Sequence, residues 1–267
     1  GLFSPRNGLE PGFAFLATSS GVAPECLCYA GAGGQAQQQM LERVSHPAND
    51  APAPAARPTP SANEGHHRRK VTILAYHAID EPVDPFTVTP KSFELQMRLI
   101  RDEYQVVRLR DLPLELGADR PSHRLVALTF DDAFLDFAAT AFPILESFQL
   151  PSTVFAPTAY VGDCSRWITH DKRFHRRPIL SWDQIRCLDR SGLVEFGSHS
   201  VDHVRMSGLP AAEMRRQAVE SRQVLERVLE KPVRAFAYPY GQPGDFSEET
   251  TCCLKEAGYT AAVTTCW

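Results

Sequence analysis

Two adjacent carboxylates are the feature of this sequence that most directly suggests chemistry. Asp131 and Asp132 follow the apolar run RLVALTF, residues 124–130. Neighbouring acids repel each other, so they must be solvated, paired with a base or bound to a cation. The pair is therefore either a turn or helix cap after a strand, or one half of a catalytic site. The local sequence leaves both interpretations open.

Two histidines four residues apart could supply the other half. His199 and His203 lie in GSHSVDH, and this spacing puts two imidazoles on one side of a helical turn or a tight loop. Zinc and similar ions take nitrogen and carboxylate ligands and keep one position open for water in catalytic sites. Two histidines and one acid meet that count, and the second acid can take a proton from the water that the metal acidifies. Two unrelated surface histidines are the alternative.

Other catalytic patterns are absent from the sequence. Ser200 follows His199, so the H-E-x-x-H helix of zinc peptidases is not present. The H-x-D arrangement of iron oxygenases, the G-x-S-x-G elbow and the P-loop are also missing. In AFAYPYGQPG, Pro239 and Gly241 favour a sharp turn, which either aims a backbone N–H at a developing oxyanion or simply joins a strand to a helix.

From Val71 onward, β-rich apolar runs alternate with helix-periodic segments. We expect strands at residues 71–77, 104–109, 124–130, 151–157, 193–199, 233–239 and 259–265. We expect helices at residues 92–104, 138–149, 181–192, 209–231 and 245–258, the last with Asp245 and Glu248 as its capping pair. This alternation predicts an α/β fold with a parallel sheet or a (β/α) barrel.

The ends of the expected strands carry the chemical groups. In parallel sheets and barrels, catalytic residues lie at the carboxyl ends of the strands. Five residues stand at such ends or follow them, namely His77, Asp131, Asp132, His199 and Tyr240. We therefore expect these residues to meet on one face of the sheet.

The first 69 residues differ in composition from the rest. Five prolines within residues 47–60 exclude a regular helix or a central strand there. We expect residues 1–69 to be a disordered or low-complexity segment with a Pro/Ala linker, followed by a catalytic domain over residues 70–267. Residues 12–23 are mildly apolar but lack the basic region and firm apolar core of a signal peptide.

The overall composition is that of an ordinary globular protein. The chain has 267 residues, 43% hydrophobic and 22% charged, with a net charge of -4. HHRRK at residues 66–70 resembles a basic patch, but a short basic run at the end of a linker is more often a solvated boundary, so no nucleic-acid partner is expected. Without an apolar run of about 18 residues, no transmembrane segment is expected. The seven cysteines contain no C-x-x-C pair, so they indicate neither a zinc ribbon nor a disulfide framework. The oligomeric state cannot be inferred from the sequence.

Several ordered motifs together resemble a known family. TFDD (129–132), HSVDH (199–203) and YPYG (238–241) resemble the polysaccharide deacetylases of the NodB-homology type, carbohydrate esterase family 4. YH at 76–77 and FTVTPKSFELQMRLI at 86–100 resemble the start of the subgroup that acts on poly-N-acetylglucosamine. The resemblance covers about residues 70–267. It implies an irregular (β/α) barrel, TIM-like with fewer strands, and a metal-dependent hydrolase that removes N-acetyl groups from a polysaccharide containing N-acetylglucosamine (GlcNAc).

The resemblance also implies a role for each motif residue. Asp131 matches the catalytic base, and the metal ligands would be Asp132, His199 and His203. Tyr240 matches the residue whose backbone N–H stabilises the oxyanion formed when metal-bound water attacks the acetyl carbonyl. We further expect Tyr240, Trp182 and His77 to contact substrate, with Tyr160 and Trp167 as other possible aromatic platforms; each of these aromatic residues could equally belong to the core.

The cofactor, partner and location follow from the same resemblance. Two nitrogens and one oxygen suit Zn²⁺ best and tolerate Co²⁺, Ni²⁺ or Fe²⁺. The expected partner is a GlcNAc-containing polysaccharide. Such glycans lie in the periplasm or at the cell surface, so the resemblance suggests a periplasmic or extracellular enzyme, although the sequence itself shows no clear signal for it.

The sequence departs from the family at three points. Ala133 stands where the family usually has glycine, and Ala237 stands where many members have an arginine, which Arg234 could replace. The family's late histidine, a general acid, lies beyond the last expected strand, so we expect a domain that is incomplete at its C-terminus. Two alternatives to the polysaccharide deacetylase therefore stay open: a related C–N hydrolase, such as an allantoinase-like enzyme, and a catalytically silent carbohydrate-binding fragment.

Overall fold

The computed structural model describes the greater part of the chain from residue 71 onward. It covers residues 71–81, 86–112, 124–169 and 176–266, and two short strands at 16–18 and 28–31. In these ranges, no helix combines the length and apolar character that crossing a membrane requires. The two early strands lie within the segment for which no regular structure is expected, and the division of the chain near residue 70 stays a prediction.

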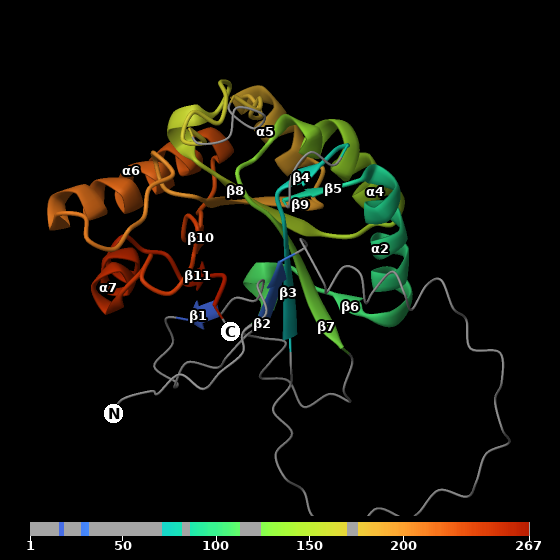
Figure 1. Ribbon diagram of the computed structural model, residues 1–267, viewed down its shortest axis with the longest axis horizontal. Helices are drawn as coiled ribbons and strands as arrows, with labels where there is room; N and C mark the ends of the chain where they lie inside the picture. The colour runs from blue at the N-terminus through green and yellow to red at the C-terminus, as the bar shows by residue number, and fades with distance from the viewer. Residues whose placement is uncertain are drawn as a thin grey trace, which may run out of the picture.

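A curled, largely parallel sheet forms the centre of the fold (Figure 1). Neighbouring strands follow the order β1-β11-β10-β9-β8-β7-β3-β2, in which only β1 runs antiparallel to its neighbour. Their bounds are Leu16–Thr18 (β1), Cys28–Gly31 (β2), Val71–Tyr76 (β3), Leu125–Phe130 (β7), Ser152–Ala156 (β8), Val194–Ser198 (β9), Ala235–Ala237 (β10) and Ala261–Val263 (β11). The predicted α/β fold with parallel strands is confirmed.

The sheet is irregular at β7, where two different strands pair along one edge. Strand β3 pairs with β7 along its whole length, from Leu125 to Phe130. The opposite edge is shared, because β6 (Gln105–Val106) pairs with the start of β7 and β8 pairs with its end. This division distinguishes the sheet from a regular barrel, and the prediction of an irregular, barrel-like α/β fold is confirmed.

Helices cover the outer face of the sheet (Figure 1). Each predicted helix is present within a few residues of its expected bounds. Pro143 lies in the first turn of α4, directly after one turn of π-helix, η2. The bounds are Pro90–Glu103 (α2), Phe137–Ala141 (η2), Phe142–Ser147 (α4), Trp182–Arg190 (α5), Ala211–Leu229 (α6) and Glu248–Glu256 (α7), with short turns at Leu109–Asp111 (η1) and Thr158–Tyr160 (η3) and a small parallel pair of strands at Ala78–Ile79 (β4) and Thr87–Val88 (β5).

The start of α7 corrects one sequence prediction. The helix is capped by Ser247, whose side chain accepts a hydrogen bond from the Thr250 N–H, and not by Asp245 and Glu248. The Asp245 carboxylate instead accepts a hydrogen bond from the Gln242 N–H and pairs with Arg205 at 2.6 Å. A tertiary ion pair therefore takes the acid that the local pattern assigns to the cap.

Two apolar clusters lie on the two faces of the sheet. The larger one fills the space between the sheet and the helices, and includes Phe93, Leu128 and Phe236. The smaller one lines the concave inner face, where strand residues alternate with those of the first cluster. The strand residues of this inner cluster are Val71, Ile73, Ala75, Leu125, Ala127, Phe155, Ala237 and Val263. Continuing the alternation past the strand ends brings His77, Asp131 and His199 to the mouth of the same concave face.

Gly197 gives a test of how tightly the inner face is packed. A Cβ at this position would lie 2.5 Å from Phe155 Cε1 and 2.9 Å from the Ala235 carbonyl oxygen. We expect Gly197→Ala to lower the free energy of unfolding by about 1–3 kcal/mol, as overpacking does elsewhere. Urea unfolding measures it. In a double-mutant cycle with Phe155→Leu, the cost of Gly197→Ala should fall, and strictly additive costs would contradict this packing.

Candidate functional site

The turn after β7 directs the two adjacent acids differently. The Asp131 N–H donates to the Tyr76 carbonyl at 2.8 Å, which ties the end of β7 to the end of β3. Asp132 and Ala133 then take the left-handed conformation, with φ of 69° and 53°. Because the left-handed conformation begins at Asp132, the chain turns directly after Asp131, and the carboxylates of Asp131 and Asp132 need not point in the same direction.

The structure shows what the alanine at position 133 costs in place of a glycine. A positive φ is used at this position, so alanine carries the strain that glycine would avoid, about 1 kcal/mol or more. Its methyl group is buried, and its carbonyl accepts a hydrogen bond from the Leu180 N–H at 2.9 Å. The alanine therefore keeps the turn that a glycine would make.

Asp132, His199 and His203 form a compact buried cluster. Asp132 Oδ1 lies 3.1 Å from His203 Nε2 and 3.6 Å from His199 Nε2. One ligand atom from each residue lies within 4.8 Å of the others. Two imidazole nitrogens and one carboxylate oxygen are a donor set that fits a divalent transition-metal ion, with coordination positions left for substrate and water.

Contacts with the surrounding strands and rings orient the two imidazoles. His199 Nδ1 lies 2.9 Å from the Ala237 carbonyl, and because a carbonyl only accepts, Nδ1 carries the proton and Nε2 keeps its lone pair. The His203 ring stacks on Trp167, with centroids 4.4 Å apart and planes at 17°. It also meets the Tyr240 ring edge-to-face at 5.0 Å.

Burial and mutual charge set the protonation of the cluster. Burial, together with the nearby charge of His203, lowers the pKa of His199 to about 3. Burial alone would raise the pKa of Asp132, but the charge and hydrogen bond of His203, with the charges of His77 and His199, lower that pKa to about 2. At neutral pH the carboxylate is thus ionised and the His199 imidazole neutral, the states that metal ligands need.

Asp131 and His77 lie beside this cluster. Asp131 Oδ2 is 4.0 Å from His77 Nε2, and the His77 side chain is 30% exposed. The exposed Phe86 ring lies 5.2 Å from the His77 ring. A carboxylate and a partly exposed imidazole therefore face each other at the mouth of the concave face, a pair able to move protons.

Asp136 and Arg177 support this pair and were missed in the sequence. Asp136 Oδ2 accepts a hydrogen bond from the Ile79 N–H at 2.6 Å, two residues after His77. Arg177 lies 3.4 Å from Asp136 Oδ1. The available signal was a third acid within TFDDAFLDF, but no local pattern shows which distant segment it binds.

Tyr240 lies in the expected sharp turn. Its φ is 64°, and the Gly241 N–H donates to the Pro239 carbonyl at 2.8 Å. Gly241 is required there, because a Cβ would lie 2.8 Å from the Thr265 nitrogen at a φ of 65°. Within the described ranges, no residue accepts a hydrogen bond from the Tyr240 N–H.

The remaining predicted residues lie elsewhere. Trp182 begins α5 and packs, partly buried, against the larger apolar cluster, and no hydrogen bond or ring contact among the described residues joins it to the Asp132 cluster. Trp167 is the tryptophan that reaches His203. Arg234 is exposed before the start of β10, at the opposite end of that strand from the site, so it does not replace an arginine at position 237.

Comparisons with known sequences agree on one family. The sequence pattern of the polysaccharide deacetylase family matches residues 118–262. YxkH of Bacillus subtilis, whose name places it among the polysaccharide deacetylases, is 27% identical over 198 residues, 73% of this chain and 64% of its own length. The poly-beta-1,6-N-acetyl-D-glucosamine N-deacetylase of Escherichia coli K12 is 28% identical over 229 residues, 72% of this chain and 33% of its own length. The chain thus spans less than two thirds of either relative.

A solved structure shares the fold. IcaB from Ammonifex degensii superposes with a TM-score of 0.59 at 26% sequence identity, covering 71% of this chain and 81% of IcaB.

The buried, neutral His199 predicts acid sensitivity of the metal-free protein. Its pKa is about 3 when folded and about 6.5 when unfolded, so between these values the unfolded state binds one more proton and stability falls as pH falls. From pH 7 to pH 5, His199 should contribute a loss on the order of 2 kcal/mol in the free energy of unfolding. Urea unfolding in chelator at both pH values measures it.

His199→Asn is the matched variant. Asparagine keeps an N–H for the Ala237 carbonyl but cannot titrate, so its stability should depend less on pH than that of the unaltered protein. Equal pH dependence in both proteins would contradict the assignment of a buried neutral imidazole.

Proposed function

The chain belongs to the polysaccharide deacetylase family, and from this premise we propose that it removes N-acetyl groups from a GlcNAc-containing polysaccharide by metal-dependent hydrolysis. The observation that carries the proposal is the buried cluster of Asp132, His199 and His203 with a second carboxylate, Asp131, beside it. The E. coli relative named for poly-beta-1,6-N-acetyl-D-glucosamine supports the choice of glycan. Because the chain spans only part of that relative, substrate and activity are inferred.

The donor set favours zinc among divalent ions. Two imidazoles and one carboxylate suit Zn²⁺, and the same set would also accept Co²⁺, Ni²⁺ or Fe²⁺. When bound, such an ion lowers the pKa of water towards neutrality and polarises a carbonyl oxygen. The chain's part is to hold the three donors together: His199 through its hydrogen bond to the Ala237 carbonyl, His203 through its stack on Trp167.

Asp131 is the proposed general base. Asp132 Oδ1 lies within 3.6 Å of Nε2 of both histidines, whereas the Asp131 carboxylate lies 4.0 Å from His77. A carboxylate there can accept the proton of the attacking water. The adjacent acids thus take different tasks, one as ligand and one as base.

His77 is proposed as the group that protonates the leaving amine. The family resemblance places this acid on a later segment, but His77 Nε2 lies 4.0 Å from Asp131 Oδ2 at the end of the neighbouring strand. Its partly exposed ring can receive a proton and pass it to the amino sugar. This role adds to the substrate contact predicted for His77.

Tyr240 is proposed to act through both its backbone and its ring. Its N–H, in the turn beside His203, is available to stabilise the negative charge on the acetyl oxygen. Its ring is 42% exposed and has the Arg205 guanidinium 4.8 Å from its centroid, so it can also contact a sugar. Tyr240 and Trp167 then form the aromatic wall, since both rings contact His203, whereas no ring contact among the described residues joins Trp182 to the cluster.

The proposed location follows from the proposed substrate. A polysaccharide that contains GlcNAc is a periplasmic or cell-surface polymer, and the enzyme must meet it there. We therefore propose that the enzyme acts in the periplasm or at the cell surface and that the glycan is its partner.

Asp131→Asn tests the function and the role of the base together. Acetate release from GlcNAc oligomers should fall by about 10²–10⁴-fold, because the base is lost, while bound zinc stays near one per chain. In the unaltered protein, a chelator should abolish acetate release and added Zn²⁺ should restore it. If the zinc-loaded, unaltered protein releases no acetate from these oligomers, the proposed function is wrong.

His77→Gln tests the proton donor. We expect kcat to fall by about 10²–10⁴-fold, because glutamine cannot donate a proton to the leaving amine. Phe86→Leu is the control, since it removes the ring beside His77 and keeps the imidazole. An unchanged kcat in His77→Gln would show that another group donates the proton.

A further inference from the structure

The loop that joins the two histidines is held in a costly conformation. Residues 199–203 form neither helix nor strand, and Ser200 and His203 have positive φ values of 65° and 52°. Each such residue costs on the order of 1 kcal/mol or more unless its surroundings enforce it. Because no helix sets the spacing of the imidazoles, contacts from outside the loop must do so.

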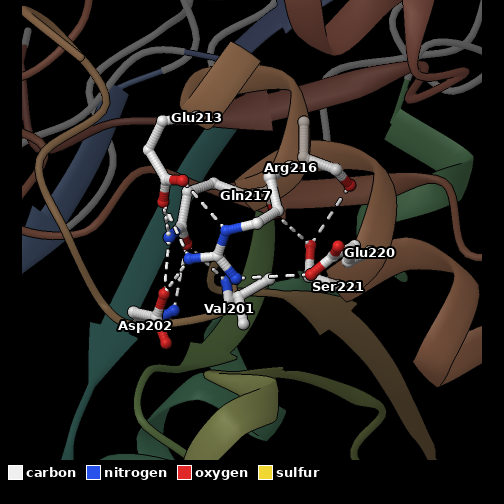
Figure 2. Close-up of polar contacts among 8 residues, drawn as sticks. Val201, Asp202, Glu213, Arg216, Gln217, Glu220 and Ser221 are labelled. Carbon is white, nitrogen blue, oxygen red and sulfur yellow. Dashed lines mark hydrogen bonds and ion pairs between the residues drawn. The ribbon is translucent and has the colours of Figure 1, made fainter. Parts of the chain in front are cut away.

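Gln217 on α6 contacts the middle of this loop (Figure 2). Its Oε1 accepts hydrogen bonds from the N–H groups of Val201 at 2.9 Å and Asp202 at 3.0 Å. Its Nε2 donates to Asp202 Oδ2 at 2.7 Å and to Glu213 Oε1 at 2.8 Å. The side chain is fully buried, and these four bonds use both its donors and both its acceptor sites.

Neighbouring groups complete the support of the loop. Arg216 bridges Asp202 and Glu213, which reduces the repulsion between these two carboxylates (Figure 2). One turn further along α6, Ser221 accepts a hydrogen bond from Ser198 Oγ at 2.7 Å, and Ser198 Oγ accepts from the Ser200 N–H at 3.1 Å. One face of α6 therefore contacts the loop between both histidines.

We propose that Gln217 is a positioning residue, which fixes the 199–203 loop so that both imidazoles can bind one ion with Asp132. The inference rests on the proposed metal-dependent function. A neutral amide suits this task, because it offers two donors and two acceptors without adding charge near the cluster. Its hydrogen bonds go to Val201 and Asp202, between the two histidines, and to Glu213 on its own helix, so Gln217 acts through the loop and not on the substrate.

Gln217→Met tests the proposal against a matched control. Methionine has a similar size and removes all four hydrogen bonds. The control is Gln96→Met, because Gln96 is a buried glutamine of α2 that bonds the Tyr76 hydroxyl at 2.9 Å and does not contact the loop. Co²⁺ is the probe, with affinity measured by titration and ligand geometry by visible absorption, well below the melting temperature of each protein.

We expect Gln217→Met to weaken Co²⁺ binding by about 10–100-fold and to alter the absorption bands, as loss of a residue supporting metal ligands does elsewhere. Gln96→Met should lower stability but leave affinity and spectrum unchanged. Affinity within about twofold of the unaltered protein, or an equal loss in both variants, would overturn the proposal.

Amide hydrogen exchange in the metal-free protein separates this inference from the proposed function. The N–H groups of Val201 and Asp202 should exchange slowly in the unaltered protein and in Gln96→Met, and faster in Gln217→Met. Unchanged exchange in Gln217→Met would overturn the inference even if metal binds. Failure of the unaltered protein to bind Co²⁺ would overturn the metal-dependent function, while the exchange result would still show whether Gln217 holds the loop.

Discussion

The surrounding structure must hold one carboxylate and two imidazoles close together at the carboxyl end of the curled sheet. Around these three groups, the backbone adopts a conformation that most residues avoid. Five of the eight non-glycine residues with positive φ in the described ranges lie in the three loops of the site, namely Asp132, Ala133, Ser200, His203 and Tyr240. At about 1 kcal/mol or more each, their strain is on the order of 5 kcal/mol, comparable with the net stability of a domain. The strain persists only because buried hydrogen bonds, ring stacking and helix contacts offset it.

The concave face explains how the sheet presents this cluster. Small and branched apolar side chains fill its lower part, and Gly197 leaves room for the Phe155 ring. One residue past the ends of β3, β7 and β9, the same alternation of side chains brings His77, Asp131 and His199 to this face. Apolar side chains next to polar groups strengthen the electrostatic interactions among those groups, and the burial of His199 accounts for most of its low pKa. The apolar packing of the fold and the chemistry of the site are thus parts of one arrangement.

The sequence predicted what depends on local pattern. Strand and helix order, the parallel sheet and the meeting of His77, the two acids and His199 at strand ends all followed from periodicity and from the rule on strand ends. The sequence did not predict the contacts between distant segments, such as those of Gln217 with Val201, Trp167 with His203 and Asp136 with Ile79. No local signal encodes which segments the fold brings together. The Asp245 cap was wrong for the same reason, because Arg205 takes that carboxylate, and the φ of Ala133 could be read only from the folded turn.

The central claim is that Asp132, His199 and His203 hold one divalent ion. X-ray absorption at the zinc edge tests it most directly, because the chain also has cysteines that could bind zinc adventitiously. For protein loaded with one equivalent of Zn²⁺, the account predicts two imidazole nitrogens at about 2.0–2.1 Å and oxygen in the remaining positions, with one imidazole lost in His203→Ala. A sulfur shell at about 2.3 Å, or a spectrum that His203→Ala leaves unchanged, would contradict the account.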